Sequence, residues 1–297
     1  MKKVSFAEFG GPDVLQLIDA EEPHAGPGQV RIAVRAAGVN PADWRVREGQ
    51  VLKAHPTELP SGVGLDAAGV VDEVGEGVEG VAVGDHVFGE GSSTYAEHAV
   101  LWAWARMPEG LTFVEAAGYP SVVETALRTI REVGVQPGQT LLVSGAAGGV
   151  GSAVLQVARD RGIKVIGTAG AANQDYLRSL GALATTYGEG WVERVRQLGQ
   201  VDAALDLAGS GVIRELVELT GDPGKVISIA DLSAPDHGVR FSGVAGSVPD
   251  ALVEAARLIS LGKLHIPVAK SYPLAEAAQA HVDSQAGHTR GRRVLVV

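Results

Sequence analysis

The chain has 297 residues and a formal net charge of −10, and its composition is 45% hydrophobic and 20% charged. This length predicts two domains, or one large α/β domain with an appendage, and the acidic balance makes nucleic acid and membrane surfaces poor default partners. Cysteine is absent, which excludes disulfides, thiolate nucleophiles, iron–sulfur clusters and zinc held by cysteine.

The first residues, MKKVSFAEFGG, lack the long apolar segment of a signal peptide. No apolar run reaches the roughly 18 residues that a membrane-spanning helix needs. We therefore expect a cytoplasmic protein.

The region from Lys3 to about Leu111 has the pattern of short strands. Hydrophobic and polar residues alternate in QVRIAVR (29–35), which is typical of a strand with one wet face. Valine runs broken by glycines follow over 68–89, as expected for strands that turn sharply in a small barrel. Spacing alone leaves any small sandwich or barrel open.

From about Thr112 short apolar strands alternate with segments of helical length. Such alternation predicts a parallel sheet covered by helices, a doubly wound α/β fold. The expected strands are 140–144, 164–169, 202–208 and 225–230, and the expected helices are 152–162, 173–181, 190–199 and 247–262. After Lys263 the pattern is mixed again, and RRVLVV (292–297) is a strand that could rejoin the first domain.

A glycine-rich turn, SGAAGGVG (144–151), joins the strand TLLVS to the following helix. Its G-x-x-G-x-x-G spacing suits a dinucleotide: glycines allow a tight turn and close approach to a pyrophosphate, and the helix N-terminus faces the phosphate charge. The candidate binding residues are Gly145, Ala146, Gly148, Gly149, Val150 and Gly151. The alternative is a glycine-rich βα turn without a ligand.

The end of the next strand distinguishes the two nicotinamide cofactors, because NAD sites usually place an acid there. KVIGTAGAAN (164–173) contains no acid, which favours NADPH, with Thr168, Gly170 and Asn173 as candidate neighbours. Gly209, Ile229 and Ala230 also follow strand ends, where doubly wound sheets bind ligands, and are expected to contact the cofactor through their backbone.

Several segments together resemble the zinc-independent quinone oxidoreductases of the medium-chain dehydrogenase/reductase superfamily. They are GPDVLQL, AAGVNPADWRVREG, GLDAAGVVDEVGEGV, VGDHVFG, YAEH, VQPGQTLLVSGAAGGVGSAVLQVAR and the closing PLAEAAQAH and GHTRGRRVLVV. The resemblance covers essentially the whole chain. It implies a GroES-like β-rich catalytic domain (1–111 and 264–297), an inserted Rossmann NADPH-binding domain (112–263) and a homodimer.

The zinc enzymes of the superfamily carry a G-H-E motif, and Gly64, Leu65 and Asp66 stand in its place. With leucine in the histidine position and no cysteine, we expect no metal. The implied reaction is hydride transfer from NADPH to a quinone or to the C=C bond of an α,β-unsaturated carbonyl, both of which are already electrophilic. Alternatives are a tailoring enoyl reductase of a polyketide-type pathway and an NADPH-binding structural or regulatory protein without turnover.

The resemblance also implies catalytic residues, Asn40 and Asp43 in GVNPADW; the alternatives are turn chemistry at Asn40-Pro41 and a helix cap at Asp43. Thr125 matches a threonine beside the nicotinamide, and Tyr187 a tyrosine near the adenosine 2′-phosphate. Arg290 and Arg292 are expected to approach the cofactor, with solvated surface cations as the alternative. The expected substrate pocket comprises Trp44, Val51, Leu52 and His55.

Overall fold

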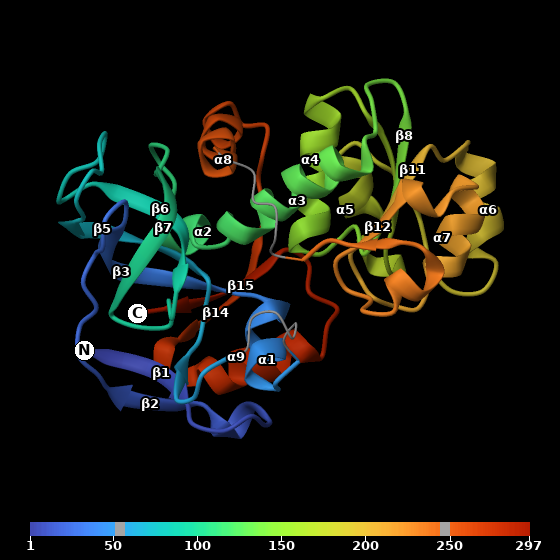
Figure 1. Cartoon of the computed structure of the whole chain (residues 1–297). Coiled ribbons are helices and arrows are strands. Elements are labelled where there is room, and N and C mark those ends of the chain that lie inside the picture. The colour runs from blue at the N-terminus through green and yellow to red at the C-terminus, as the bar shows by residue number, and fades with distance from the viewer. Residues whose placement is uncertain (51–56, 244–249) are drawn as a thin grey trace. The chain divides into compact units, whose positions relative to one another are not determined.

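The computed structural model describes residues 1–50, 57–243 and 250–297, which form two compact units (Figure 1). The first unit comprises Met1–Ser121, Leu252–Leu261 and Ile266–Val297, and the second comprises Val122–Ala251 and Gly262–His265. The division after Ser121 is ten residues later in the chain than the predicted boundary at 111.

The first unit is rich in strands. These are β1 (Lys2–Phe6), β2 (Gln16–Asp19), β3 (Val30–Val39), β4 (Ser61–Gly62), β5 (Asp66–Val74), β6 (His86–Ser92), β7 (His98–Arg106), β14 (Val268–Pro273) and β15 (Arg292–Val296). Its helices are α1 (Pro41–Arg47), α2 (Phe113–Ala116), α8 (Ala251–Ser260), α9 (Ala277–Gln285) and the 3-10 turns η1 (Pro12–Val14) and η5 (Leu274–Glu276).

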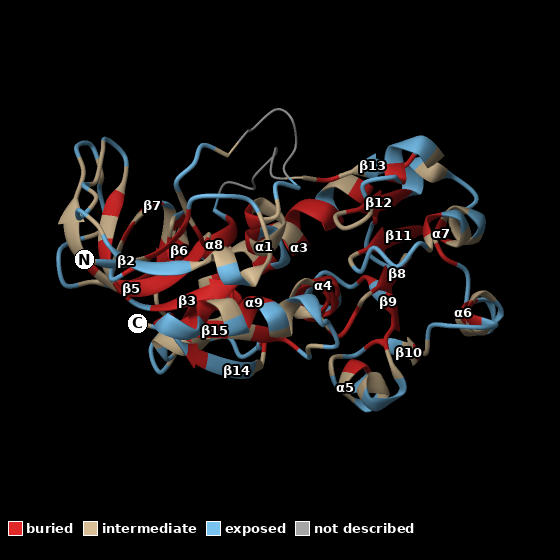
Figure 2. Cartoon of the chain, turned by 90° about the horizontal axis from the view of Figure 1, so that it is seen from below, coloured by how far each residue is buried: buried red, intermediate tan, exposed pale blue. Residues whose placement is uncertain are grey.

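The central strand β3 organises this unit. The larger sheet has the order β14-β15-β3-β5-β6-β7, and β3 also pairs with β7, so the strands β3, β5, β6 and β7 close into a barrel. β15 pairs antiparallel with β3, so the last strand belongs to the first unit. Alternate residues of β3 (Val30, Ile32 and Val34) are buried, because one face of the strand points into the barrel. Figure 2 shows the burial of β3, β5 and β15.

The second unit alternates strands and helices. The strands are β8 (Thr140–Ser144), β9 (Lys164–Thr168), β10 (Leu183–Thr185), β11 (Ala203–Asp206), β12 (Val226–Ser228) and β13 (Arg240–Phe241). The helices are α3 (Pro120–Val133), α4 (Gly149–Asp160), α5 (Gln174–Ser179), α6 (Trp191–Leu198), α7 (Ile213–Thr220) and the 3-10 turns η2 (Ala171–Asn173), η3 (Pro223–Lys225) and η4 (Ala234–His237).

All strand pairs of this sheet are parallel, in the order β10-β9-β8-β11-β12-β13. The order reverses at β8, which makes the carboxyl end of β8 the topological switch point where doubly wound sheets bind ligands. On one face α6 and α7 bury Trp191, Val195 and Leu216 against Leu142 and Ile166 of the sheet. The predicted class, a β-rich domain with a doubly wound parallel-sheet domain, is confirmed.

Candidate functional site

The glycine-rich turn lies at the switch point, between β8 and α4. Gly145 has a φ of +80°, which favours glycine, and a Cβ on Gly151 would lie 2.5 Å from the carbonyl oxygen of Gly145. A Cβ on Gly148 would meet only that same oxygen, at 3.5 Å. The fold itself therefore requires glycine at 145 and 151, whereas the space beside Gly148 is left open.

The N-terminus of α4 is suited to an anion. The N-cap residue is Gly148, no side chain caps the helix, and no acid occurs in its first turn. The first backbone N–H groups of a helix have no partner within it, and the helix dipole adds positive charge there. Together with the open space at Gly148, these groups form a cradle that fits a pyrophosphate.

Other predicted cofactor residues lie at the same edge of the sheet. Thr168 ends β9, Gly170 is the N-cap residue of η2, and Asn173 is the last residue of η2. A Cβ on Gly170 would lie 3.3 Å from the hydroxyl of Tyr187, which is 55% exposed after β10. The amide of Gln174 donates to the carbonyls of Ala169, Gly170 and Thr185 and fixes this corner.

The loops that carry Gly209 and Ala230 are held by a buried pair that sequence reasoning missed. Asp206, at the end of β11, accepts hydrogen bonds from the backbone N–H of Gly209 (3.0 Å) and from the hydroxyl of Ser228 (2.8 Å). The Ser228 oxygen accepts in turn from the backbone N–H of Ala230 (3.2 Å). The sequence signal for this pair was Asp206 itself, an acid that ends the otherwise apolar strand β11.

Two further predicted cofactor residues belong to other elements. Thr125 is on α3, where its hydroxyl accepts a bond from Arg128 (3.3 Å). Arg290 is exposed and belongs to the first unit.

The first unit contains a second polar cluster, which begins at Asn40, the N-cap residue of α1. The carboxylate of Asp43 accepts from the backbone N–H of Asn40 and from the hydroxyl of Tyr95, both at 2.8 Å. Asp43 is only 3% exposed, and this burial raises its pKa to about 7 despite the two bonds. The contact with the backbone N–H of Asn40 is the helix cap that the sequence analysis gave as the alternative role of Asp43.

Asp66 connects Asn40 to two residues that the sequence analysis did not place here. Its Oδ2 accepts from Asn40 Nδ2 (3.0 Å), Ser121 Oγ (2.7 Å) and Arg292 Nη2 (3.0 Å), and its Oδ1 accepts from the Ser121 backbone N–H (3.0 Å). Burial raises the pKa of Asp66, and the charge of Arg292 opposes this rise. Arg292 is 4% exposed and engaged with Asp66, so it is not a surface cation.

A third buried group joins α1 to α9. Arg47 donates to the carbonyl oxygen of Gly10 (3.0 Å) and contacts His281 Nδ1 (3.1 Å) and Glu48 (2.7 Å). Burial, and then the charge of Arg47, lower the pKa of His281 to about 3, so this imidazole is neutral near pH 7.

Of the predicted substrate pocket, only Trp44 can be located. It is half-buried on α1, and its indole N–H has no hydrogen-bond partner in the part of the chain that the structure describes. Val51, Leu52 and His55 lie outside the described residues.

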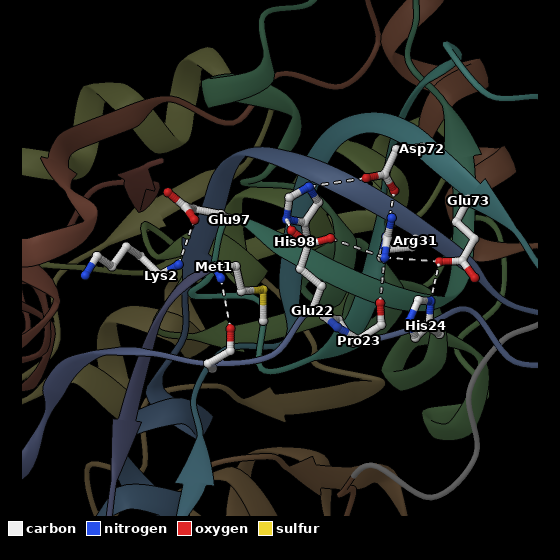
Figure 3. Close-up of polar contacts among 11 residues, drawn as sticks. Met1, Lys2, Glu22, Pro23, His24, Arg31, Asp72, Glu73, Glu97 and His98 are labelled. Carbon is white, nitrogen blue, oxygen red and sulfur yellow. Dashed lines mark hydrogen bonds and ion pairs between the residues drawn. The ribbon is translucent and has the colours of Figure 1, made fainter.

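A further polar cluster surrounds Arg31 on β3 (Figure 3). Its guanidinium bonds Asp72 (3.0 Å) and the carbonyl oxygen of Pro23 (2.9 Å) and lies 3.2 Å from Glu73. Because Arg31 balances these acids and fixes the segment before β3, the cluster is structural.

Within residues 1–50, 57–243 and 250–297 no group of three or more acidic or histidine side chains is arranged to hold a metal ion. In the same ranges no helix is long and apolar enough to cross a membrane.

Two family models match the chain. Residues 26–119 match the alcohol dehydrogenase GroES-like domain, and residues 180–295 match the zinc-binding dehydrogenase domain. The second name includes zinc, but the chain has no cysteine and has leucine at position 65.

Three curated proteins among those similar to the chain come from different organisms. It is 38% identical to a component of the pikromycin polyketide synthase of Streptomyces venezuelae, over 94% of this chain and 8% of that protein. It is 34% identical to 2-methylene-furan-3-one reductase of Solanum lycopersicum, over 81% of this chain and 65% of that protein. It is 31% identical to the quinone oxidoreductase of Pseudomonas aeruginosa, over 99% of both. The chain thus spans only part of the first two relatives.

Solved structures that have the same fold along the whole chain include two quinone oxidoreductases. The quinone oxidoreductase of Coxiella burnetii has a TM-score of 0.87 at 31% identity, covering 100% of this chain and 99% of that one. The quinone oxidoreductase of Escherichia coli complexed with NADPH has a TM-score of 0.85 at 26% identity, covering 100% of both.

Proposed function

Because the chain belongs to the quinone oxidoreductase family of the medium-chain dehydrogenase/reductase superfamily, we propose that it is an NADPH-dependent, metal-free oxidoreductase. Its acceptors are quinones or the C=C bond of α,β-unsaturated carbonyls. The observation that carries this proposal is the cradle at Gly148, where an uncapped twelve-residue helix faces a space that the fold leaves open.

The residues of the second unit fit NADPH. When bound, NADPH supplies a hydride to an electron-poor carbon. The backbone N–H groups at the start of α4 would hold its pyrophosphate, and the hydroxyl of Tyr187 would donate to the 2′-phosphate. The strand-end loops at Gly209 and Ala230 would contact the nicotinamide half through their backbone.

In the first unit Asn40 is our candidate for orienting the acceptor. One N–H of its side-chain amide bonds Asp66, and an amide nitrogen carries two hydrogens. The second N–H can donate to the acceptor carbonyl oxygen, where negative charge develops as hydride arrives. Asp43 would support this by fixing the backbone of Asn40 rather than by touching the acceptor.

An absorbance assay tests the proposal. Purified protein with NADPH and a panel of quinones and enones should consume NADPH, seen as loss of absorbance at the wavelength of the reduced nicotinamide. Added chelator should leave the rate unchanged, because the acceptor brings its own activation. Tight NADPH binding without consumption on any acceptor would instead favour a structural or regulatory role.

A second candidate function is enoyl reduction in a polyketide-type pathway, which the 38% identity to the polyketide synthase component favours. An acyl-thioester reductase needs a proton donor, and the enoyl-thioester reductases related to this family use a tyrosine as that donor. The first tyrosine of this chain, Tyr95, is fully buried and donates to Asp43, which supports a free quinone or enone instead. Comparing crotonyl thioesters with free enones in the same assay separates the two functions.

We also propose a homodimer, which the family resemblance supports. Light scattering at the mass of one chain would refute it. The cytoplasmic location expected from the sequence stays a prediction.

A further inference from the structure

The side-chain amide of Asn40 donates a hydrogen bond to Asp66, which forms a buried ion pair with Arg292. Arg292, at the start of β15, and Asp66, at the start of β5, are 3.0 Å apart and have side-chain exposures of 4% and 0%. Two glycines make room for the arginine. A Cβ on Gly38 would lie 2.9 Å from Arg292 Nη2, and a Cβ on Gly118 would lie 3.3 Å from Arg292 Cγ. Burying such a pair is costly and is seldom explained by stability alone.

The carboxylate of Asp66 determines which way the Asn40 amide faces. Arg292 and the backbone N–H of Ser121 are obligate donors to it, so Asp66 acts as an acceptor. A carboxylate accepts only from the nitrogen end of an amide, so the Asn40 nitrogen faces Asp66. A protonated carboxyl group or an asparagine at position 66 can both donate and accept, so either would allow the Asn40 amide to rotate by 180° and exchange its oxygen and nitrogen.

We propose that Arg292 is a positioning residue for hydride transfer: by pairing with Asp66, it holds the Asn40 amide with an N–H directed to the acceptor carbonyl. This inference rests on the proposed function. Arg292 itself touches neither the acceptor nor the cofactor; it acts through Asp66 on Asn40. The Ser121 hydroxyl lies 2.7 Å from Asp66 Oδ2 and 3.1 Å from Asn40 Oδ1, and so contacts the oxygen end of the same amide.

A double-mutant cycle tests the proposal with NADPH and 1,4-naphthoquinone. Arg292→Met should lower kcat by about tenfold to hundredfold, as expected when a donor to a developing oxyanion is lost, with the NADPH Kd unchanged. Arg292→Lys, which keeps the charge, should recover most of kcat. In an Asn40→Ala background Arg292→Met should have no further effect. Equal losses of kcat in both backgrounds, or an unchanged kcat for Arg292→Met, would overturn the proposal.

A spectroscopic readout keeps this test independent of turnover. The side-chain amide resonances of Asn40, assigned by their absence in Asn40→Ala, should exchange slowly with solvent in the wild type and in Arg292→Lys, and rapidly in Arg292→Met. Slow exchange in all three would contradict the inference even if no acceptor is reduced, whereas absent turnover with the expected exchange contradicts only the proposed function. If Arg292→Met does not fold, Asp66→Asn/Arg292→Met removes both charges and replaces it in the kinetic cycle and the exchange measurement.

Discussion

Single glycines in the turn after β8 are used for different physical reasons. Gly145 has a positive φ, and Gly151 brings α4 against the backbone of the turn. Gly148 has an ordinary φ of −71° and open space in the direction of its missing side chain. At this position the fold does not require glycine, and we propose that the bound cofactor does.

Replacing Gly148 with leucine should therefore separate binding from folding. We expect the variant to fold, because its Cβ meets no close backbone atom, and to bind NADPH at least ~100-fold more weakly, a loss of about 2.7 kcal/mol. Calorimetric titration measures the affinity, and circular dichroism checks the fold. Gly151→Leu is the control that should fail to fold stably, since its Cβ would lie 2.5 Å from a carbonyl oxygen. NADPH affinity unchanged in Gly148→Leu would refute the cradle.

At the scale of elements, α1 is too short to be stable alone and depends on its surroundings. Asn40 and Asp43 cap its N-terminus, and Arg47 anchors its last turn to Gly10 and to His281 on α9. Because Asn40 is both the N-cap of α1 and our candidate acceptor contact, the position of this short helix sets the position of the candidate site.

Arg47→Met should lower the free energy of unfolding by about 2–4 kcal/mol, because it leaves the carbonyl oxygen of Gly10 and Nδ1 of the buried His281 without a donor. Arg45→Met is the matched control on the same helix. Arg45 is half-buried beside the ring of Trp44, and we expect a loss below about 1 kcal/mol. Denaturant titration compares the two variants. Equal losses would show that Arg47 does not anchor the helix.

At the scale of the whole molecule, two buried groups give opposite pH dependences of stability. The pKa of Asp43 rises from 3.8 to about 7, so its contribution to stability is present at low pH and lost as pH rises through 7. The pKa of His281 falls from 6.5 to about 3, so its contribution is present above pH 6.5 and lost as pH falls towards 3. Between pH 4 and 6.5 the two slopes oppose each other.

Removing either group should expose the slope of the other. Relative to the wild type, Asp43→Asn should lose stability on acidification from pH 6.5, by an amount on the order of 3 kcal/mol by pH 4. His281→Gln should lose stability as pH rises from 4 to 7. Denaturant unfolding of the three proteins across this range measures both effects. Parallel pH profiles for the three proteins would show that neither group titrates as described.

Much of the second unit could be predicted from the sequence because its signals are local. The strands at 140–144 and 164–168, the helix after Gly148 and the glycine turn all depend on residues close together in the chain. The polar cluster of the first unit could not be predicted in this way. Asn40, Asp66, Ser121 and Arg292 lie far apart in the chain, and the bonded pair Asp66 and Arg292 is separated by 226 residues. Each of the four has an ordinary explanation as a turn, strand, helix-start or surface residue.

The sequence by itself determined the fold class and the family, and it located the glycine turn that we propose as the cofactor cradle, since periodicity, glycine spacing and the lack of cysteine are properties of residue order and type. Only the tertiary structure decided that Arg292 is buried against Asp66, that Asp43 caps α1, and that Asp206 fixes the loop at Gly209. The physical reason is that a charged side chain has the same sequence signature on a surface as in the interior. Its role depends on the partners that the pairing of distant strands brings to it.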